Sequence, residues 1–222
     1  GAALSAEKQK AAWELEATGV AKRLGVADDK IKGVVTAYAD ARASQVAALT
    51  KMREDLMKKP ADKDDDKEGD APRPRGGPEA MQAMEETNKA EREKLQKALG
   101  AALTPEQTTK AMKSLGTFNR QWDMMVDAVA GFNLEAAKQQ SALEAIEDFV
   151  GSQEKVRSAG ADGDREAMRT AMEGARAKLT EAIKKVLSEE QLTKFEELMG
   201  RGGRGMGGRP GGGLSLIHIS EP

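Results

Sequence analysis

The stretch IKGVVTAYADARASQVAALTKMREDL, residues 31–56, decides the fold class. Its apolar and small residues recur every three or four positions, which is the period of an α-helix with one buried face. A helix of about 30 residues is a rod roughly 45 Å long. The same period returns around residues 122–129, 142–156 and 168–186, and no stretch alternates with a period of two. The sequence therefore predicts an all-α fold.

The composition sets the kind of core and excludes several classes of site. The 222 residues include eleven Met but only two Trp, one Tyr and four Phe, so the core must be mostly aliphatic. The absence of Cys excludes disulfides, thiolate zinc sites and iron–sulfur clusters, and a single His excludes paired-histidine metal sites. The lone His also argues against a Ser-His-Asp hydrolase. We expect no metal site and no cofactor.

Charge and hydropathy favour neither nucleic acid nor a membrane as partner. The formal net charge is −2, without the basic excess of a nucleic-acid-binding domain. No run of about 18 apolar residues is present, so we expect no membrane span. Carboxylates are numerous but follow exposed helix faces, so we expect no catalytic residues and no enzyme. Trp13 and Trp122 are expected to anchor the core.

Two correspondences within the chain indicate an internal repeat. Residues 92–116 align without gaps with residues 176–200, and ten of the 25 positions are identical. Upstream, the pattern from Trp13 to Val20 and Ala21 returns from Trp122 to Val129 and Ala130. One insertion, the segment 58–78, reconciles the two spacings. The sequence predicts a tandem repeat of long antiparallel helical hairpins that form an elongated bundle.

The repeat divides the chain into six predicted parts. These are an N-terminal lead (1–12), helical repeat A (13–116), its solvated loop (58–78), helical repeat B (117–200), a disordered Gly/Arg tail (201–213) and a final segment (214–222). The final segment, LSLIHISEP, fits nothing before it, and we interpret it as translated sequencing-adapter sequence. It holds the only His.

Two of these parts have alternative interpretations. In the loop, residues 64–69 resemble the start of a calcium loop with Gly69 at position six, but position twelve is Arg75 where an EF-hand needs Glu. The Gly/Arg tail could bind RNA, although only three Arg and no aromatic residues are present. A solvated loop and a flexible tail are the preferred interpretations.

The motif that the repeat shares predicts two helix starts. Thr104 and Ser188 are expected as N-caps, and Gln107 and Gln191 at position N3 would complete capping boxes. Pro105 suits position N1. Glu106 and Glu190 are expected near the positive end of the helix dipole, and Leu103 and Leu187 at the hydrophobic staple. The predicted cap set is therefore Leu103, Thr104, Glu106, Gln107, Leu187, Ser188, Glu190 and Gln191. These residues are expected to be structural.

This double motif is similar to the L-T-x-x-Q signature of the LTXXQ, or Spy/CpxP-like, family of exported proteins. The resemblance rests on residues 103–107 and 187–191, with weaker echoes at 24–30 and 134–138. It implies an antiparallel helical hairpin fold, a periplasmic or otherwise exported location, and ATP-independent holding of unfolded clients. Some relatives bind metals through histidines, which this chain lacks outside residues 214–222. Known members dimerise, and a tandem repeat offers a way to make the same arrangement within one chain, so the sequence predicts no single oligomeric state.

Two functional hypotheses follow. The first is an exported ATP-independent chaperone-like or stress-adaptor protein that binds unfolded clients on its helix faces. The alternative is a non-catalytic structural or protein-interaction module of the cell envelope. Methionine repacks easily around irregular surfaces, so we list four as candidate client-binding residues, although helical spacing also suits a core role: Met124, Met125, Met168 and Met172.

Overall fold

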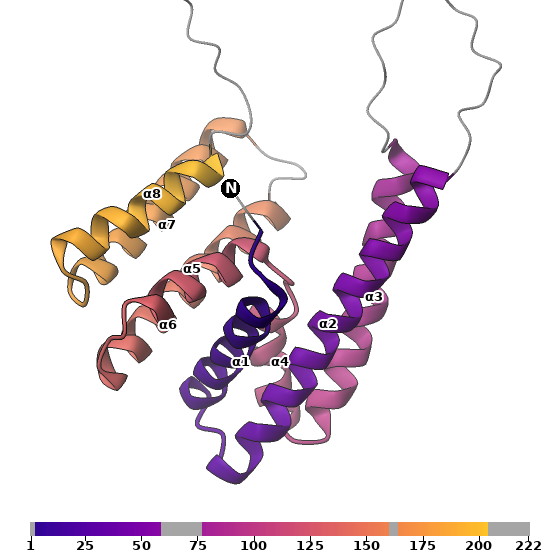
Figure 1. Cartoon of the computed structure of the whole chain (residues 1–222), viewed down its shortest axis with the longest axis horizontal. Helices are drawn as coiled ribbons and strands as arrows, with labels where there is room; N and C mark the ends of the chain where they lie inside the picture. Colours follow the sequence, from indigo (N-terminus) through magenta and orange to yellow (C-terminus); the bar gives the residue numbers. More distant parts are fainter. Residues whose placement is uncertain (1–2, 59–76, 160–163, 204–222) are drawn as a thin grey trace, which may run out of the picture.

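The computed structural model describes residues 3–58, 77–159 and 164–203, and this part of the chain contains eight α-helices and no strand (Figure 1). The predicted all-α class is confirmed. The helices are α1 (Ala6–Arg23), α2 (Asp28–Lys58), α3 (Pro78–Gly100), α4 (Pro105–Leu115), α5 (Arg120–Gly131), α6 (Ala136–Ala159), α7 (Arg165–Lys184) and α8 (Glu189–Gly203). The long helix expected from residues 31–56 is α2, of 31 residues. None of the described helices is long and apolar enough to cross a bilayer.

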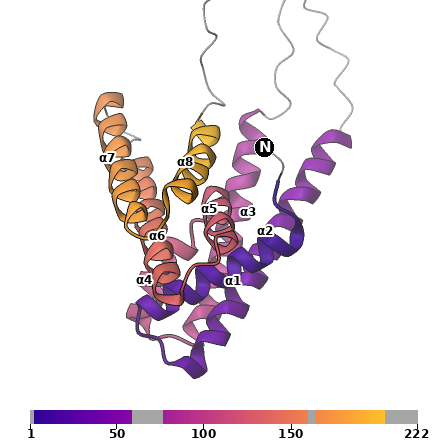
Figure 2. The same cartoon turned by 60° about the vertical axis from the view of Figure 1, so that its left-hand side comes forward.

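The helices pack in an order that is the same in both halves of the chain. In the first half α1 contacts α2, α2 contacts α3, and α4 returns against α3 and α1. In the second half α5, α6, α7 and α8 make the same four contacts. Helices α1 and α5 join the halves, and α6 also contacts α1 and α4. Figure 2 shows the α2–α3 and α6–α7 hairpins leaving this centre as two separate arms.

The turn between α1 and α2 is a complete C-capping motif. The amide of Val26 donates to the carbonyl of Ala21 at 3.0 Å, and the amide of Gly25 donates to that of Lys22 at 3.1 Å. This is the Schellman pattern, and it needs a left-handed residue, which is Gly25 with φ +68°. Residues 24–30 show a weak similarity to the L-T-x-x-Q pattern. Their first three residues form the C-terminal cap of α1.

A single aliphatic core with two tryptophans joins the helices. Trp13 and Trp122 are 5% and 1% exposed, which confirms them as core anchors. The ring of Trp122 lies 6.5 Å from that of Tyr38, centroid to centroid, in a tilted arrangement. Leu95, Leu99 and many small or branched residues complete the cluster.

Two predicted boundaries are wrong. Helix α1 begins at Ala6, capped by Ser5, and thus takes in most of the predicted lead 1–12. Helix α8 runs to Gly203, so residues 201–203 are helical where a disordered tail was predicted; the last turn extends a helix whose buried face ends at Met199. Two predicted segments lie outside the described residues. The first is 59–76, which contains the calcium-loop alternative, and the second is 204–222, which contains most of the tail and the final segment.

Candidate functional site

The predicted helix-cap residues form both capping boxes. The hydroxyl of Thr104 accepts from the Gln107 amide at 3.1 Å, and the Gln107 side chain accepts from the Thr104 amide at 3.1 Å. Ser188 and Gln191 repeat the pair at 3.2 and 3.0 Å. Their neighbours also serve the fold: Glu106 pairs with Lys110, Glu190 pairs with Lys194, and Leu103 and Leu187 are buried. The motif thus starts α4 and α8.

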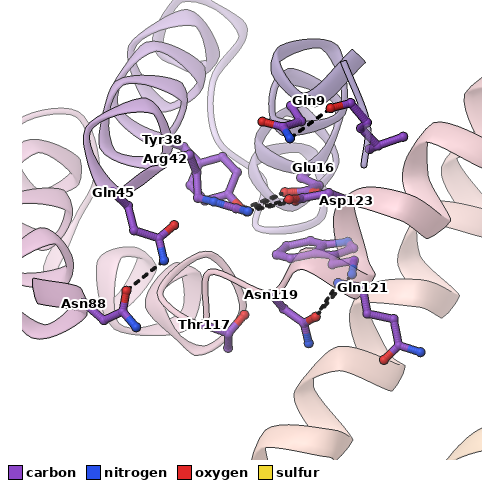
Figure 3. A network of polar contacts seen from close by, with 12 residues as sticks. Gln9, Glu16, Tyr38, Arg42, Gln45, Asn88, Thr117, Asn119, Gln121 and Asp123 are labelled. Carbon is purple, nitrogen blue, oxygen red and sulfur yellow. Dashed lines mark hydrogen bonds and ion pairs between the residues drawn. The ribbon is translucent and has the colours of Figure 1, made fainter. Parts of the chain in front are cut away.

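A buried polar cluster connects α1, α2 and α5 (Figure 3). Arg42 donates to both carboxylate oxygens of Asp123, at 2.9 and 2.5 Å, and to the hydroxyl of Tyr38 at 2.7 Å. Tyr38 in turn donates to Glu16 at 2.6 Å. All four side chains are buried, and the Arg42 guanidinium lies 5.1 Å from the centre of the Trp13 ring. Such a cation over an aromatic face is stabilised by the ring quadrupole.

Two buried carboxyls of the cluster, Glu16 and Asp123, share one cation, Arg42. Burial, together with the nearby charge of Asp123, raises the pKa of Glu16 well above its usual value. Arg42 and Asp123 form a buried ion pair, and a carboxylate oxygen of Glu16 lies 3.7 Å from the same guanidinium. A buried pair is sustained only by good geometry and added hydrogen bonds, which the bidentate contact and Tyr38 supply.

The four side chains of the cluster are shielded from solvent, at 5% exposure or less. Its four residues line neither of the two cavities described below. Acid–base catalysis requires a substrate within hydrogen-bond reach of the titrating group. Within the described residues, no three carboxylate or imidazole groups come together as a metal site. The arrangement holds three helices in register.

This cluster was not predicted from the sequence, although a signal was present. Arg42 stands four residues after Tyr38 and eight after Val34, on the apolar face of the 31–56 pattern. Glu16 lies between Trp13 and Val20 on the apolar face of its helix. A charge on an apolar face indicates a buried partner. The identity of that partner, Asp123, depends on packing between α2 and α5.

An open groove of about 1350 Å³ lies between α4, α6 and α7. Its exposed apolar lining comes from Met112 and from small residues such as Ala175 and Ala182, whereas Phe149 and Leu179 also border it but are only 2% and 3% exposed. Charged side chains from α3, α4, α6 and α7 surround it: Arg92, Lys113, Lys155 and Lys178. A smaller hollow of about 200 Å³ lies between α7 and α8 and is lined partly by Leu192, Phe195 and Met199.

The four methionines expected to bind clients do not share one face. Met125 is fully buried with Trp122 and Val126, so its prediction as a client-binding residue is wrong. The physical reason is the helical step of about 100° per residue, which turns Met124 outward to 36% exposure when Met125 points inward. Met168 and Met172 are partly buried on α7.

Other methionines are far more exposed. Among the described residues, the exposed large apolar side chains are Val46, Met57, Met81, Met84 and Met124. Three of these five belong to the outer end of the α2–α3 arm, where Met52 is half-buried. We call Met52, Met57, Met81 and Met84 the methionine patch.

Comparisons with models of protein families, with curated proteins and with solved structures gave no match.

Proposed function

We propose that this protein holds partly unfolded polypeptides without ATP, as a chaperone-like protein of the cell envelope, and that the methionine patch is its client-binding surface. The observation that carries the proposal is the exposure of Met57 and Met81, at 74% and 66%. Leaving long apolar side chains in water is unfavourable, by roughly 25 cal/mol per Å² of exposed apolar area. Their gathering at one end of an arm is typical of a surface that binds something.

The geometry of the arm supports the patch as one surface. Ser44 donates to Glu91 at 3.0 Å and Gln45 to Asn88 at 2.8 Å, which fixes α2 and α3 in antiparallel register. In this register the part of α2 near Met52 lies beside the part of α3 near Met81. Unbranched thioether side chains repack around irregular partners, which suits a binder of varied unfolded chains.

The packing order supports a second part of the proposal, that two copies of one four-helix unit make up the chain. Positions that the sequence repeat aligns are buried in both halves: Trp13 and Trp122, Val34 and Ala142, Tyr38 and Ile146, Leu95 and Leu179, and Leu99 and Ile183. Together with the two capping boxes, this agrees with the resemblance to the LTXXQ family. The exported location in the proposal rests on that resemblance alone.

Suppression of aggregation tests the proposal. At a stoichiometric ratio, the protein should reduce light scattering from a chemically denatured client that is diluted into buffer. Met57→Gln/Met81→Gln keeps side-chain length and should abolish most of this effect, because the thioethers carry the contact. The matched control Val46→Gln/Met124→Gln changes two exposed apolar residues elsewhere and should retain it. No suppression by the unaltered protein would leave the alternative, an envelope interaction module without chaperone activity.

A further inference from the structure

The groove between α4, α6 and α7 has helical walls, with small side chains on α7. Its α7 wall presents Ala175, Lys178, Leu179 and Ala182, which are spaced as one helix face. Small alanines on that wall let a partner approach closely. The α6 wall extends from Ala145 to Ala159, roughly 21 Å or about fourteen residues of helix.

The backbone chemistry of the groove also favours a helical occupant. All its long walls are helices, whose amides and carbonyls are already paired along their own axes. An extended segment would find no sheet edge there and would leave its own backbone groups unpaired on an apolar surface. A helix satisfies those groups internally and needs only side-chain contacts.

The charged residues around the groove favour an occupant that carries negative charge. Its three acidic residues are already engaged: Glu147 and Asp148 face Arg23 at 3.5 and 2.7 Å, and Glu154 faces Arg157 at 3.5 Å. In contrast, four exposed cationic residues make no ion pair within the part of the chain that the structure describes. These are Arg92, Lys113, Lys155 and Lys178, from the four helices α3, α4, α6 and α7.

We propose that this groove binds an amphipathic helix of a partner protein, with apolar residues on one face and Asp or Glu along the flanks of that face. The apolar face covers the half-buried Met112, Ala175 and Ala182, and the acidic flanks meet the four cations. This surface is separate from the methionine patch, which lies on the other arm. Complementary charge steers such a partner and makes its binding sensitive to salt.

Two labelled peptides test the proposal on the full chain. Both are fourteen-residue helices with the same Leu/Ala face; one has Glu and the other Lys at the flanking positions. In fluorescence anisotropy the acidic peptide should bind about tenfold or more tightly than the basic one at low salt, and weaken as salt rises. Lys155→Glu/Lys178→Glu should reduce its affinity by about tenfold or more. All these side chains are exposed, so the fold should persist.

The control reverses two other exposed lysines on the same helices. Lys138→Glu/Lys184→Glu changes the net charge equally but lies outside the groove, and it should alter the affinity by less than about twofold. Equal binding of the two peptides, or an equal effect of the control, would overturn the proposal. So would comparable binding of single-stranded RNA or phosphatidylserine vesicles that is lost in Lys155→Glu/Lys178→Glu. Aggregation suppression is scored separately with the methionine variants, so the two proposals fail independently.

Discussion

At the scale of single residues, Arg42 links the two halves of the chain. It is 1% exposed, and its bidentate contact with Asp123 crosses from the first half of the chain to the second. Arg42→Met leaves the Asp123 carboxylate buried without its cation, so the free energy of unfolding should fall by about 3–5 kcal/mol. Urea denaturation followed by circular dichroism measures the loss.

A second variant distinguishes the destabilisation caused by leaving Asp123 without its cation from the contribution of the intact ion pair to stability. The position of Arg42 corresponds to Val150 in the second half, which is buried and apolar. Arg42→Met/Asp123→Leu removes both charges and should recover much of the stability, because apolar replacement of a buried pair is often nearly neutral. A double variant no more stable than Arg42→Met would contradict this account of the cluster.

Glu16 gives the fold a pH dependence with a definite sign. Its pKa is raised in the folded protein, so between the unfolded value near 4.3 and the folded value the native state binds more protons than the unfolded chain. Stability is fully present below the unfolded pKa and decreases as pH rises towards the folded one, by up to about 1.4 kcal/mol per pH unit for this single group.

Glu16→Gln isolates this contribution. The amide cannot ionise, so the variant should lose less stability than the unaltered protein between pH 5 and pH 7.5. Chemical denaturation at the two pH values gives the comparison, and the difference between the two proteins cancels the titration of all other groups. Identical pH profiles would show that Glu16 is ionised in the fold.

At the scale of helices, the sequence predicted the features that depend on hydrogen bonds and periodicity within a single helix. The capping boxes were predictable because Thr104 and Gln107 lie three residues apart and their hydrogen bonds close within one helical turn. The period of residues 31–56 likewise predicted α2. The contact of Arg42 with Asp123 was not predictable, since 81 residues separate them and only the packing of α2 against α5 joins them. The choice between Met124 and Met125 depended on which face of α5 meets α1.

The first capping box should make a measurable contribution to the free energy of unfolding. Thr104→Ala removes the side-chain acceptor at the start of α4 and should lower the free energy of unfolding by about 1 kcal/mol, in the range of roughly 0.5–2. Thr104→Ser keeps the hydroxyl and should stay within about 0.5 kcal/mol of the original. An equal loss in both variants would mean that the methyl group, and not the cap, is what matters.

The turn between α1 and α2 depends on the one described glycine with positive φ. Gly25→Ala places a Cβ in the left-handed region and should cost about 1–2 kcal/mol, although nothing lies within 4 Å of that Cβ. Gly174→Ala, inside α7 with the same open surroundings, is the matched control and should not lower stability, because Ala is favoured over Gly within a helix. Thermal denaturation of both variants makes the comparison, and equal losses would contradict the assignment of strain to Gly25.

At the scale of the whole molecule, two arms meet at a centre made from α1, α4 and α5 (Figure 1). The sequence predicted the all-α class, the long helix α2 and the N-caps of α4 and α8, because each depends on period or on neighbours in the chain. It did not predict the surfaces between helices. The groove requires α4, α6 and α7 together, and the exposure of Met57 and Met81 depends on the α2–α3 arm projecting from the centre. Both proposed functions therefore belong to this scale.

The most direct test of client binding is the methyl spectrum of the methionines. With ¹³C-labelled methionine methyl groups, a permanently unfolded client should shift or broaden the signals of Met57, Met81 and Met84, while the buried Met125 should stay unchanged. This would place the client on the α2–α3 arm. A client that leaves these three signals unaltered, or that perturbs only Met124, Met168 and Met172, would contradict the proposed binding surface.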